Sequence, residues 1–363
     1  MKTQDSAQPA VSIDEEVLQE LVGKALVDLG ATWNAGLIQI GDKLGLYTAL
    51  AAADVPITST ELADRTGTTE RYVREWLRAQ AAGGYVTYHA DGDAYSMTLE
   101  QAMLFADEDS PVFLVGGFQN SAASIHAVPQ LIEAFRTGEG VGWHEHNHEL
   151  FEGTERFFRP AYVHNLASVW IPLLDGVEEK LTAGARVADI ACGHGASTIE
   201  MAKAFPNSTF VGYDYHEASI EAARGRAADA GVDDRVRFET ATAKAFNGAG
   251  YDFITTFDAF HDLGDPAGAA RHVRNMLAPG GTWMLVEPYA SNEVEENFTP
   301  VGRAFYAAST MACVPCSLDQ EVGTALGAQA GEARLREIIG ESGFSTVRLA
   351  TETPFNLILE ARV

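Results

Sequence analysis

The sequence has little cysteine, with only Cys192, Cys313 and Cys316 in a chain of 363 residues. Three cysteines cannot form the disulfide framework on which small secreted proteins depend, and they suit a reducing compartment. The first residues, MKTQDSAQPAVSIDEEV, turn acidic where a secretory signal peptide would carry a basic and then an apolar segment. We therefore expect a cytoplasmic protein.

Positive charge is also scarce, because 25 Lys and Arg stand against 51 Asp and Glu, for a formal net charge of −26. This charge repels polyphosphates and anionic lipid surfaces, so we expect no nucleic-acid partner. No stretch approaches the roughly 20 apolar residues that cross a bilayer, and we expect no membrane partner. The 46% share of hydrophobic residues still indicates a globular protein, and its length predicts two folded units.

The N-terminal part of the chain has the apolar spacing of helices. From Ile13 to about Ala53, apolar residues recur every three or four positions, with interruptions near Gly30 and Gly41. This pattern predicts two or three helices, with breaks near those glycines.

A winged helix is predicted between residues 57 and 98, where two short helices precede a β-hairpin that turns at Asp91 and Gly92. A winged helix can bind DNA, and the second helix carries three arginines. However, residues 54–110 hold eleven acidic residues against four arginines, and the wing has no basic residue. We therefore interpret this region as a module for dimerisation and for covering the substrate.

Residues 111–180 look helical, and after Arg186 strands alternate with helices in the manner of a parallel sheet that is covered on both faces. Only Thr-Pro-Phe separates the last two strand-like runs, so we expect them to form an antiparallel hairpin at the edge of the sheet. The seven runs are RVADIA, STFVGYD, VRFETA, YDFITTFDAF, GTWMLVEP, TVRLATE and NLILEA.

The stretch VADIACGHGAST, residues 187–198, joins the first of these strands to a helix. Gly193 and Gly195 match the first two positions of the Gly-x-Gly-x-x-Gly dinucleotide pattern, but Thr198 takes the third. Asp214 closes the second strand, where a carboxylate can accept hydrogen bonds from both ribose hydroxyls of a bound adenosine. Both NAD and S-adenosylmethionine contain an adenosine whose ribose hydroxyls can donate to such a carboxylate.

The rest of the region resembles class I S-adenosylmethionine-dependent methyltransferases over residues 187–363. The resemblance rests on the seven-strand series that ends in a hairpin, on Asp189 within the first strand, and on LAPGG before the fifth. With the winged helix included, nearly the whole chain resembles two-domain methyltransferases of the mycobacterial type, through ACGHGAST, FHDLGDP and ALGAQAGE. These proteins are related in layout to small-molecule O-methyltransferases.

This resemblance implies an α/β fold, with a Rossmann-like seven-stranded methyltransferase sheet and an N-terminal, mainly α winged-helix domain. It divides the chain into a dimerisation domain at 1–110, a helical connector that covers the substrate at 111–180, and a methyltransferase domain at 181–363. A lid is expected at about 290–330 in the last of these. The implied cofactor is S-adenosylmethionine, and the product is S-adenosylhomocysteine.

The same resemblance implies a set of cofactor contacts. Asp189 would lie near the methionine amine, the two glycines would line the methionine and ribose, and Asp214 would bind the ribose. The family's Gly-Asp-Ala contact to adenine is replaced by Ala241, Thr242 and Ala243, so Thr242 either accepts a weaker hydrogen bond or is a strand-end residue without a ligand. The cofactor contacts implied are Asp189, Gly193, Gly195, Asp214, Tyr215 (against the adenine), Thr242, Ala243 and Phe257.

His261 and Asp262 follow the fourth strand, at the edge of the sheet where ligands bind. Many related O-methyltransferases have a His–Asp pair here, and an imidazole can remove the proton from an acceptor hydroxyl. His261 is therefore a candidate general base, or else a pocket-lining residue. Asp262 is a candidate catalytic partner, a structural partner or a helix N-cap. Tyr162, in a segment that resembles the family's Phe-x-x-Ala-Met, and Asn165 are candidates for the substrate pocket.

Two further patterns resemble metal or redox sites. His144, His146 and His148 alternate in what reads as a loop, where three imidazoles need not converge, so we assign no metal. The CVPC stretch, Cys313 to Cys316, lies in the expected lid, away from the place of a thioredoxin motif and without a second pair for zinc. Cys192 is interpreted as a small packing residue.

Together these features predict a homodimeric S-adenosylmethionine-dependent methyltransferase that acts on a small, partly apolar molecule, with oxygen as the favoured acceptor and His261 as the base. Two alternatives remain open from the sequence. One is a C- or N-methyltransferase, including a metal-assisted one, and the other is a winged-helix regulator that senses S-adenosylmethionine.

Overall fold

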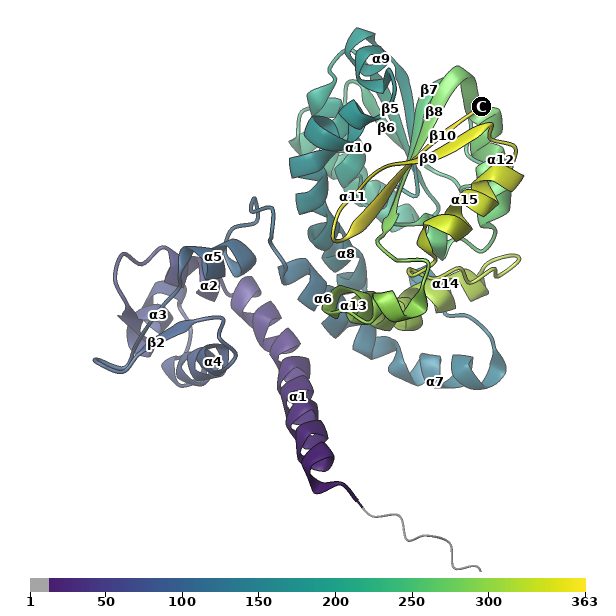
Figure 1. The fold of residues 1–363 in the computed structure, drawn as a ribbon. Coiled ribbons are helices and arrows are strands. Elements are labelled where there is room, and N and C mark those ends of the chain that lie inside the picture. Colours follow the sequence, from purple (N-terminus) through teal and green to yellow (C-terminus); the bar gives the residue numbers. More distant parts are fainter. Residues whose placement is uncertain (1–12) are drawn as a thin grey trace, which may run out of the picture. The chain divides into compact units, whose positions relative to one another are not determined.

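The computed structural model describes residues 13–363, which divide into two compact units, one up to Ala102 and one from Met103 to Val363 (Figure 1). The first unit has the predicted order of a winged helix. Its strands form a three-stranded sheet in the order β1-β3-β2. The elements are α1 (Glu15–Lys43), α2 (Leu46–Ala51), β1 (Ile57–Thr58), α3 (Ser59–Thr66), α4 (Glu70–Ala82), β2 (Thr87–His89), β3 (Ala94–Ser96) and α5 (Leu99–Phe105).

The predicted break near Gly30 is wrong, because α1 runs without interruption from Glu15 to Lys43, whereas the break predicted near Gly41 lies at Leu44 and Gly45, between α1 and α2. A glycine inside a helix costs only about 1 kcal/mol relative to alanine, which a 29-residue helix can absorb. Gly41 has a packing reason: a Cβ there would lie 2.5 Å from Cζ2 of Trp76 and 2.7 Å from Cε2 of Tyr47. The Trp76 indole also donates to the carbonyl of Leu37, at 2.8 Å. Gly41 thus lets α4 cross α1 closely.

The second unit contains the predicted seven-stranded sheet, in the order β6-β5-β4-β7-β8-β10-β9. The first five strands are parallel, and β10 pairs antiparallel with both β8 and β9. The terminal hairpin is confirmed, with β9 at the edge and β10 inside it. The strands are β4 (Arg186–Ile190), β5 (Thr209–Asp214), β6 (Val236–Thr240), β7 (Tyr251–Phe257), β8 (Leu277–Pro288), β9 (Thr346–Glu352) and β10 (Asn356–Arg362).

Helices cover both faces of this sheet (Figure 1). One core contains side chains of α10 and α11, and the other contains side chains of α12 and α15. Strands β4 and β7 are buried almost throughout, as expected at the centre of a parallel sheet that helices cover on both faces. The helices are α6 (Val115–Ser124), α7 (Val128–Thr137), α8 (His148–Ala161), α9 (Val177–Ala183), α10 (Ala196–Ala204), α11 (Glu217–Asp229), α12 (Pro266–Met276), α13 (Pro300–Ala308), α14 (Val314–Asp319) and α15 (Gly331–Glu341).

The strand order reverses direction between β4 and β7, and such a switch point opens a crevice beyond the carboxyl ends of the strands. Two short helical segments border this region. They are the π-helix η3 (Tyr162–Trp170), which continues from α8, and the 3₁₀-helix η5 (Phe260–Asp262), which follows β7. None of the helices in the described residues is both long and apolar enough to cross a membrane.

The packing of α1 predicts opposite effects of alanine at its two glycines. Gly41→Ala should lower the free energy of unfolding by about 1–3 kcal/mol, because the new methyl group overlaps the Trp76 ring. Gly30→Ala is the matched control: no atom lies within 4 Å of its Cβ position, and helix propensity should raise stability by up to about 1 kcal/mol. Urea unfolding of both variants tests this, and equal effects at the two sites would contradict the close crossing.

Candidate functional site

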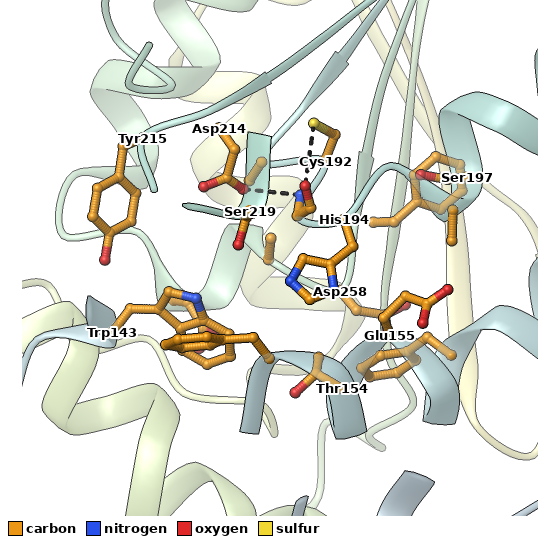
Figure 2. Close-up of a pocket in the computed structure, with 18 of the residues that line it drawn as sticks. Trp143, Thr154, Glu155, Cys192, His194, Ser197, Asp214, Tyr215, Ser219 and Asp258 are labelled. Carbon is orange, nitrogen blue, oxygen red and sulfur yellow. Dashed lines mark hydrogen bonds between the residues drawn. The ribbon is translucent and has the colours of Figure 1, made fainter. Parts of the chain in front are cut away.

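A cleft lies beyond the carboxyl ends of β4, β5 and β7, where the strand order reverses (Figure 2). Helix α8 and the start of α14 provide its other walls. Its charged side chains are all acidic, since no Lys or Arg lines it. The lining includes Trp143, Phe151, Thr154, Glu155, Phe158, Tyr162, Cys192, Gly193, His194, Asp214, Tyr215, Phe257, Asp258, Asp262, Leu263, Cys316 and Gln320.

The turn after β4 forms the floor of the cleft, and its two glycines serve different purposes. Both have positive φ, 52° at Gly193 and 81° at Gly195. A Cβ on Gly195 would lie 2.6 Å from Cζ of Phe238, so this glycine allows the turn to pack against β6. No atom lies within 4 Å of the Cβ position of Gly193. Gly193 therefore leaves its backbone open to a ligand.

Asp214, at the end of β5, ties that turn to the neighbouring strand. Its Oδ2 accepts a hydrogen bond from the Gly193 amide at 2.9 Å, and its Oδ1 accepts one from the His216 amide at 2.8 Å (Figure 2). Burial raises the pKa of Asp214, and these two amides oppose the rise. Each carboxylate oxygen has a second lone pair, so Asp214 can still accept from a ligand hydroxyl.

Asp189 lies beneath the turn and is not among the residues that line the cleft. Its Oδ2 accepts from the hydroxyls of Ser197 at 2.7 Å and Thr198 at 2.6 Å, and its Oδ1 accepts from Thr255 at 2.9 Å. Burial raises the pKa of Asp189 to about 6 despite these bonds. Thr198, which occupies the third position of the glycine pattern, thus anchors the first turn of α10 to β4.

The other predicted cofactor and substrate residues divide into two groups. Tyr215, Phe257 and Tyr162 line the cleft, and the rings of Tyr162 and Phe257 are 5.0 Å apart. Thr242, Ala243 and Asn165 do not line it. Thr242 is exposed after β6, and the Asn165 amide donates to the carbonyl of Ala161 at 3.0 Å.

His261 and Asp262 lie at the cleft wall together with Glu287, which the sequence analysis missed. The Nδ1 of His261 is 2.8 Å from Oε2 of Glu287, and its Nε2 is 3.2 Å from Oδ1 of Asp262. Asp262 lines the cleft, whereas His261 is buried behind it. The proposed N-cap role of Asp262 is wrong, because Asp265 caps α12 by accepting from the Gly268 amide.

Burial alone would lower the pKa of His261, but Asp262 and Glu287 outweigh it and raise that pKa well above its ordinary value. The Asp262 carboxyl has a raised pKa because it is buried. A proton is therefore held strongly within this cluster. Glu287 is a buried carboxylate in an otherwise apolar strand, WMLVEP, and that contrast is the signal by which the sequence could have identified it.

Asp258 is a second residue that the sequence analysis missed. It lines the cleft in a left-handed backbone conformation, with φ 49°. Its Oδ2 accepts from the Tyr162 hydroxyl at 2.9 Å, and its Oδ1 accepts from the Asn356 amide at 2.8 Å. Burial, followed by the charge of Glu287, raises the pKa of Asp258 to about 8. Strained backbone of this kind often marks functional sites.

The three alternating histidines do not come together into a cluster in the described residues. His146 is buried, while His144 and His148 are exposed. The CVPC stretch reaches the site, because Cys316 lines the cleft and Cys313 lies near His261 and Asp262. Cys192 also lines the cleft.

The cleft fits an adenosyl sulfonium. Gly193 offers open backbone, the Asp214 carboxylate keeps lone pairs for a further donor, and the cleft has no Lys or Arg to repel a sulfonium. His194 lines the cleft, and its Nδ1 is buried without a hydrogen-bond partner (Figure 2). Such an orphaned nitrogen is typical of a site that a polar ligand completes.

Comparison with known proteins identifies both units. Residues 181–337 match a methyltransferase domain, and residues 34–106 match an Rv2258c-like winged HTH domain. The chain is 35% identical over 136 residues to 27-O-demethylrifamycin SV methyltransferase of Amycolatopsis mediterranei, a match that covers 35% of this chain and 49% of the relative. The chain thus spans about half the length of the curated relatives it matches.

Solved structures show the same fold along nearly the whole chain. The mitomycin 7-O-methyltransferase superposes with a TM-score of 0.69 at 21% identity, covering 96% of this chain and 99% of that one. Human N-acetylserotonin methyltransferase, solved in complex with S-adenosylmethionine, superposes with a TM-score of 0.66 at 15% identity, covering 97% and 99%. The chain thus contains a methyltransferase domain at residues 181–337, preceded by an Rv2258c-like winged HTH domain at residues 34–106.

Proposed function

We propose that this protein transfers the methyl group of S-adenosylmethionine to an oxygen atom of a small, partly apolar molecule. The observation that carries the proposal is the position of Asp262, which lines the cleft above Gly193 and Asp214 and contacts His261, with His261 and Glu287 buried behind it. The names of the relatives support oxygen as the acceptor, since they methylate hydroxyl groups of rifamycin and mitomycin precursors.

Aromatic side chains at the cleft support a partly apolar acceptor. Trp143 and Phe151 lie on one side, with ring centroids 5.1 Å apart, and Phe158 and Tyr162 stack at 6.4 Å on the other. Mostly apolar pockets with a few convergent polar groups are typical of small-molecule sites. Here Asp258 and Asp262 supply those polar groups.

In this proposal the bound cofactor supplies an electrophilic methyl group, and the chain orients both reactants. Asp214 would hold the ribose, the Gly193 backbone would line the methionine and ribose, and Tyr215 would lie against the adenine. Asp189 acts as a positioning residue through Ser197 and Thr198. His261 accepts the acceptor's hydroxyl proton from its neutral form, in which Nδ1 donates to Glu287 and Nε2 is unprotonated, with Asp262 between it and the cleft. Because its neighbours raise the pKa of His261, this form becomes more populated as pH rises. Holding the acceptor in line with the methyl group reduces the entropic part of the barrier.

We propose a homodimer formed through the winged-helix unit. Helix α1 carries a stripe of apolar side chains along one face, and all of them are exposed. Their spacing of three and four residues places them on the same side of the helix. The stripe consists of Leu18, Val22, Leu26, Leu29 and Trp33.

We expect no nucleic-acid partner, because the arginines of α4, the second helix of the winged helix, already form ion pairs with acidic side chains. In α4 and the wing, the pairs are Arg71 with Glu75, Arg74 with Glu70, and Arg78 with Asp93. We place the protein in the cytoplasm, a proposal that the three free cysteines support.

The base assignment predicts a specific loss in the His261→Ala variant. Turnover should fall by about 10²- to 10⁴-fold, because the acceptor hydroxyl loses its proton acceptor, while affinity for S-adenosylhomocysteine stays the same. The measurement is S-adenosylhomocysteine release over a panel of hydroxylated aromatic compounds, with calorimetry for the affinity. His164→Ala, at an exposed histidine outside the cleft, is the control. Undiminished turnover would remove the base role.

The apolar stripe predicts that charge on α1 dissociates the dimer. The double variant Leu26→Glu and Trp33→Glu should sediment as a monomer where the unmodified protein sediments as a dimer, because two carboxylates cannot be buried without partners. Ala31→Glu, at an exposed position on the opposite face of α1, should remain dimeric. Sedimentation velocity measures the oligomeric state of each protein directly. If the unmodified protein sediments as a monomer, the proposed dimer is wrong.

A further inference from the structure

Cys313 reaches the cleft wall from a part of the chain that lies far from His261 in sequence. It ends the segment η7 (Ser309–Cys313), and α14 follows it directly. One ligand atom each of His261, Asp262 and Cys313 lies within 4.8 Å of the others, and this is the one such group among the described residues. His261 is buried, and the other two side chains are partly buried.

The hydrogen bonding of His261 leaves its Nε2 facing the other two residues. Because Glu287 lies 2.8 Å from Nδ1, the ring donates its Nδ1 proton there, and a neutral ring then has a lone pair on Nε2. Nε2 lies 3.2 Å from Oδ1 of Asp262, yet Oδ1 is buried and makes no hydrogen bond. The two atoms are therefore close without being aligned for a hydrogen bond. The Cys313 thiol hydrogen-bonds to both His261 and Asp262, so a proton now lies among the three ligand atoms, and a divalent cation can take its place.

We propose that His261, Asp262 and Cys313 bind one divalent transition-metal ion of the zinc type. A nitrogen, a carboxylate oxygen and a sulfur are ligands that zinc accepts, whereas magnesium and calcium take oxygen alone. Zinc bonds of 2.0–2.2 Å to nitrogen and oxygen give a tetrahedral edge of about 3.3–3.6 Å, and the 3.2 Å separation of Nε2 and Oδ1 lies just below this range. Coordination displaces the thiol proton of Cys313 to solvent.

Glu287 is the positioning residue of this site. A metal-binding histidine ordinarily donates its other ring N–H to a carboxylate, which fixes the ring and its tautomer. The bond from Nδ1 of His261 to Glu287 has this form, and Glu287 is itself held by the Phe260 amide at 2.9 Å. The ring is thus oriented before any ion binds.

The catalytic role of the ion rests on the proposed function, whereas the binding of the ion is independent of it. Asp262 belongs both to the metal site and to the cleft lining, so the ion lies at the wall where the acceptor binds. An acceptor hydroxyl bound to a divalent cation loses its proton more readily. The ion and the proton compete for Nε2 of His261, so in the metal-bound protein the ion replaces His261 as the group that activates the hydroxyl.

The test uses tag-free, full-length protein that has been stripped of metal with a chelator and kept under a non-thiol reductant. Cobalt(II) is the probe, because it occupies zinc sites and a cysteine ligand gives a sulfur-to-cobalt charge-transfer band in the near ultraviolet. We expect this band to saturate at one equivalent per chain and to disappear when zinc is added. No band at one equivalent overturns the proposal, and it leaves the His261→Ala turnover test unaffected.

Variants distinguish cobalt binding at this site from cobalt binding elsewhere on the chain. Cys313→Ser should abolish the band, and Glu287→Gln should weaken cobalt affinity about 10- to 100-fold while keeping the band. Cys316→Ser, one helical turn further on, is the matched control and should keep both the band and the affinity. A band that persists in Cys313→Ser, or that disappears in Cys316→Ser instead, contradicts the ligand set. Circular dichroism confirms that each variant is folded.

Discussion

The two backbone amides that donate to Asp214 are the contacts on which the rest of the site depends. One carboxylate joins the turn after β4, through Gly193, to the end of β5, through His216. On the side that faces the cleft, the backbone at Gly193 is accessible, because no atom lies near its Cβ position. On the other side the turn packs tightly, because Gly195 lies against the Phe238 ring. The parallel sheet makes this possible, because it brings the carboxyl ends of β4, β5 and β7 to one edge.

Charge gives the site its chemical character. The cleft has acidic side chains and no Lys or Arg along its wall, so it disfavours anionic ligands. Burial raises the pKa of Asp258, which lines the cleft, to about 8, and the pKa of Asp189, which lies beneath the turn, to about 6. The hydroxyls and amides that surround them, from Thr198 to Tyr162, keep them in fixed positions. The site is thus preorganised before a ligand binds.

The sequence allowed prediction of the seven strands, the terminal hairpin and the winged helix, because each follows from local apolar spacing and turn residues. It missed contacts that join distant segments. Local patterns do not show that Gly41 makes room for Trp76 or that Asp189 accepts hydrogen bonds from three hydroxyls. They also do not show that tertiary packing places Cys313 beside His261. Such partners depend on how helices fold over the sheet, which no local pattern records.

The central claim is that an adenosyl ligand binds above Gly193 with its ribose on Asp214, and calorimetric titration with S-adenosylhomocysteine tests it most directly. The account predicts one site per chain, and a dissociation constant weakened about 10- to 100-fold in Asp214→Asn, as expected for a lost hydrogen bond to a charged group of about 1.5–3 kcal/mol. Asp229→Asn, at the end of α11 and outside the cleft, should bind as the unmodified protein does. Absence of heat with the unmodified protein, or equal affinity in Asp214→Asn, would contradict the account.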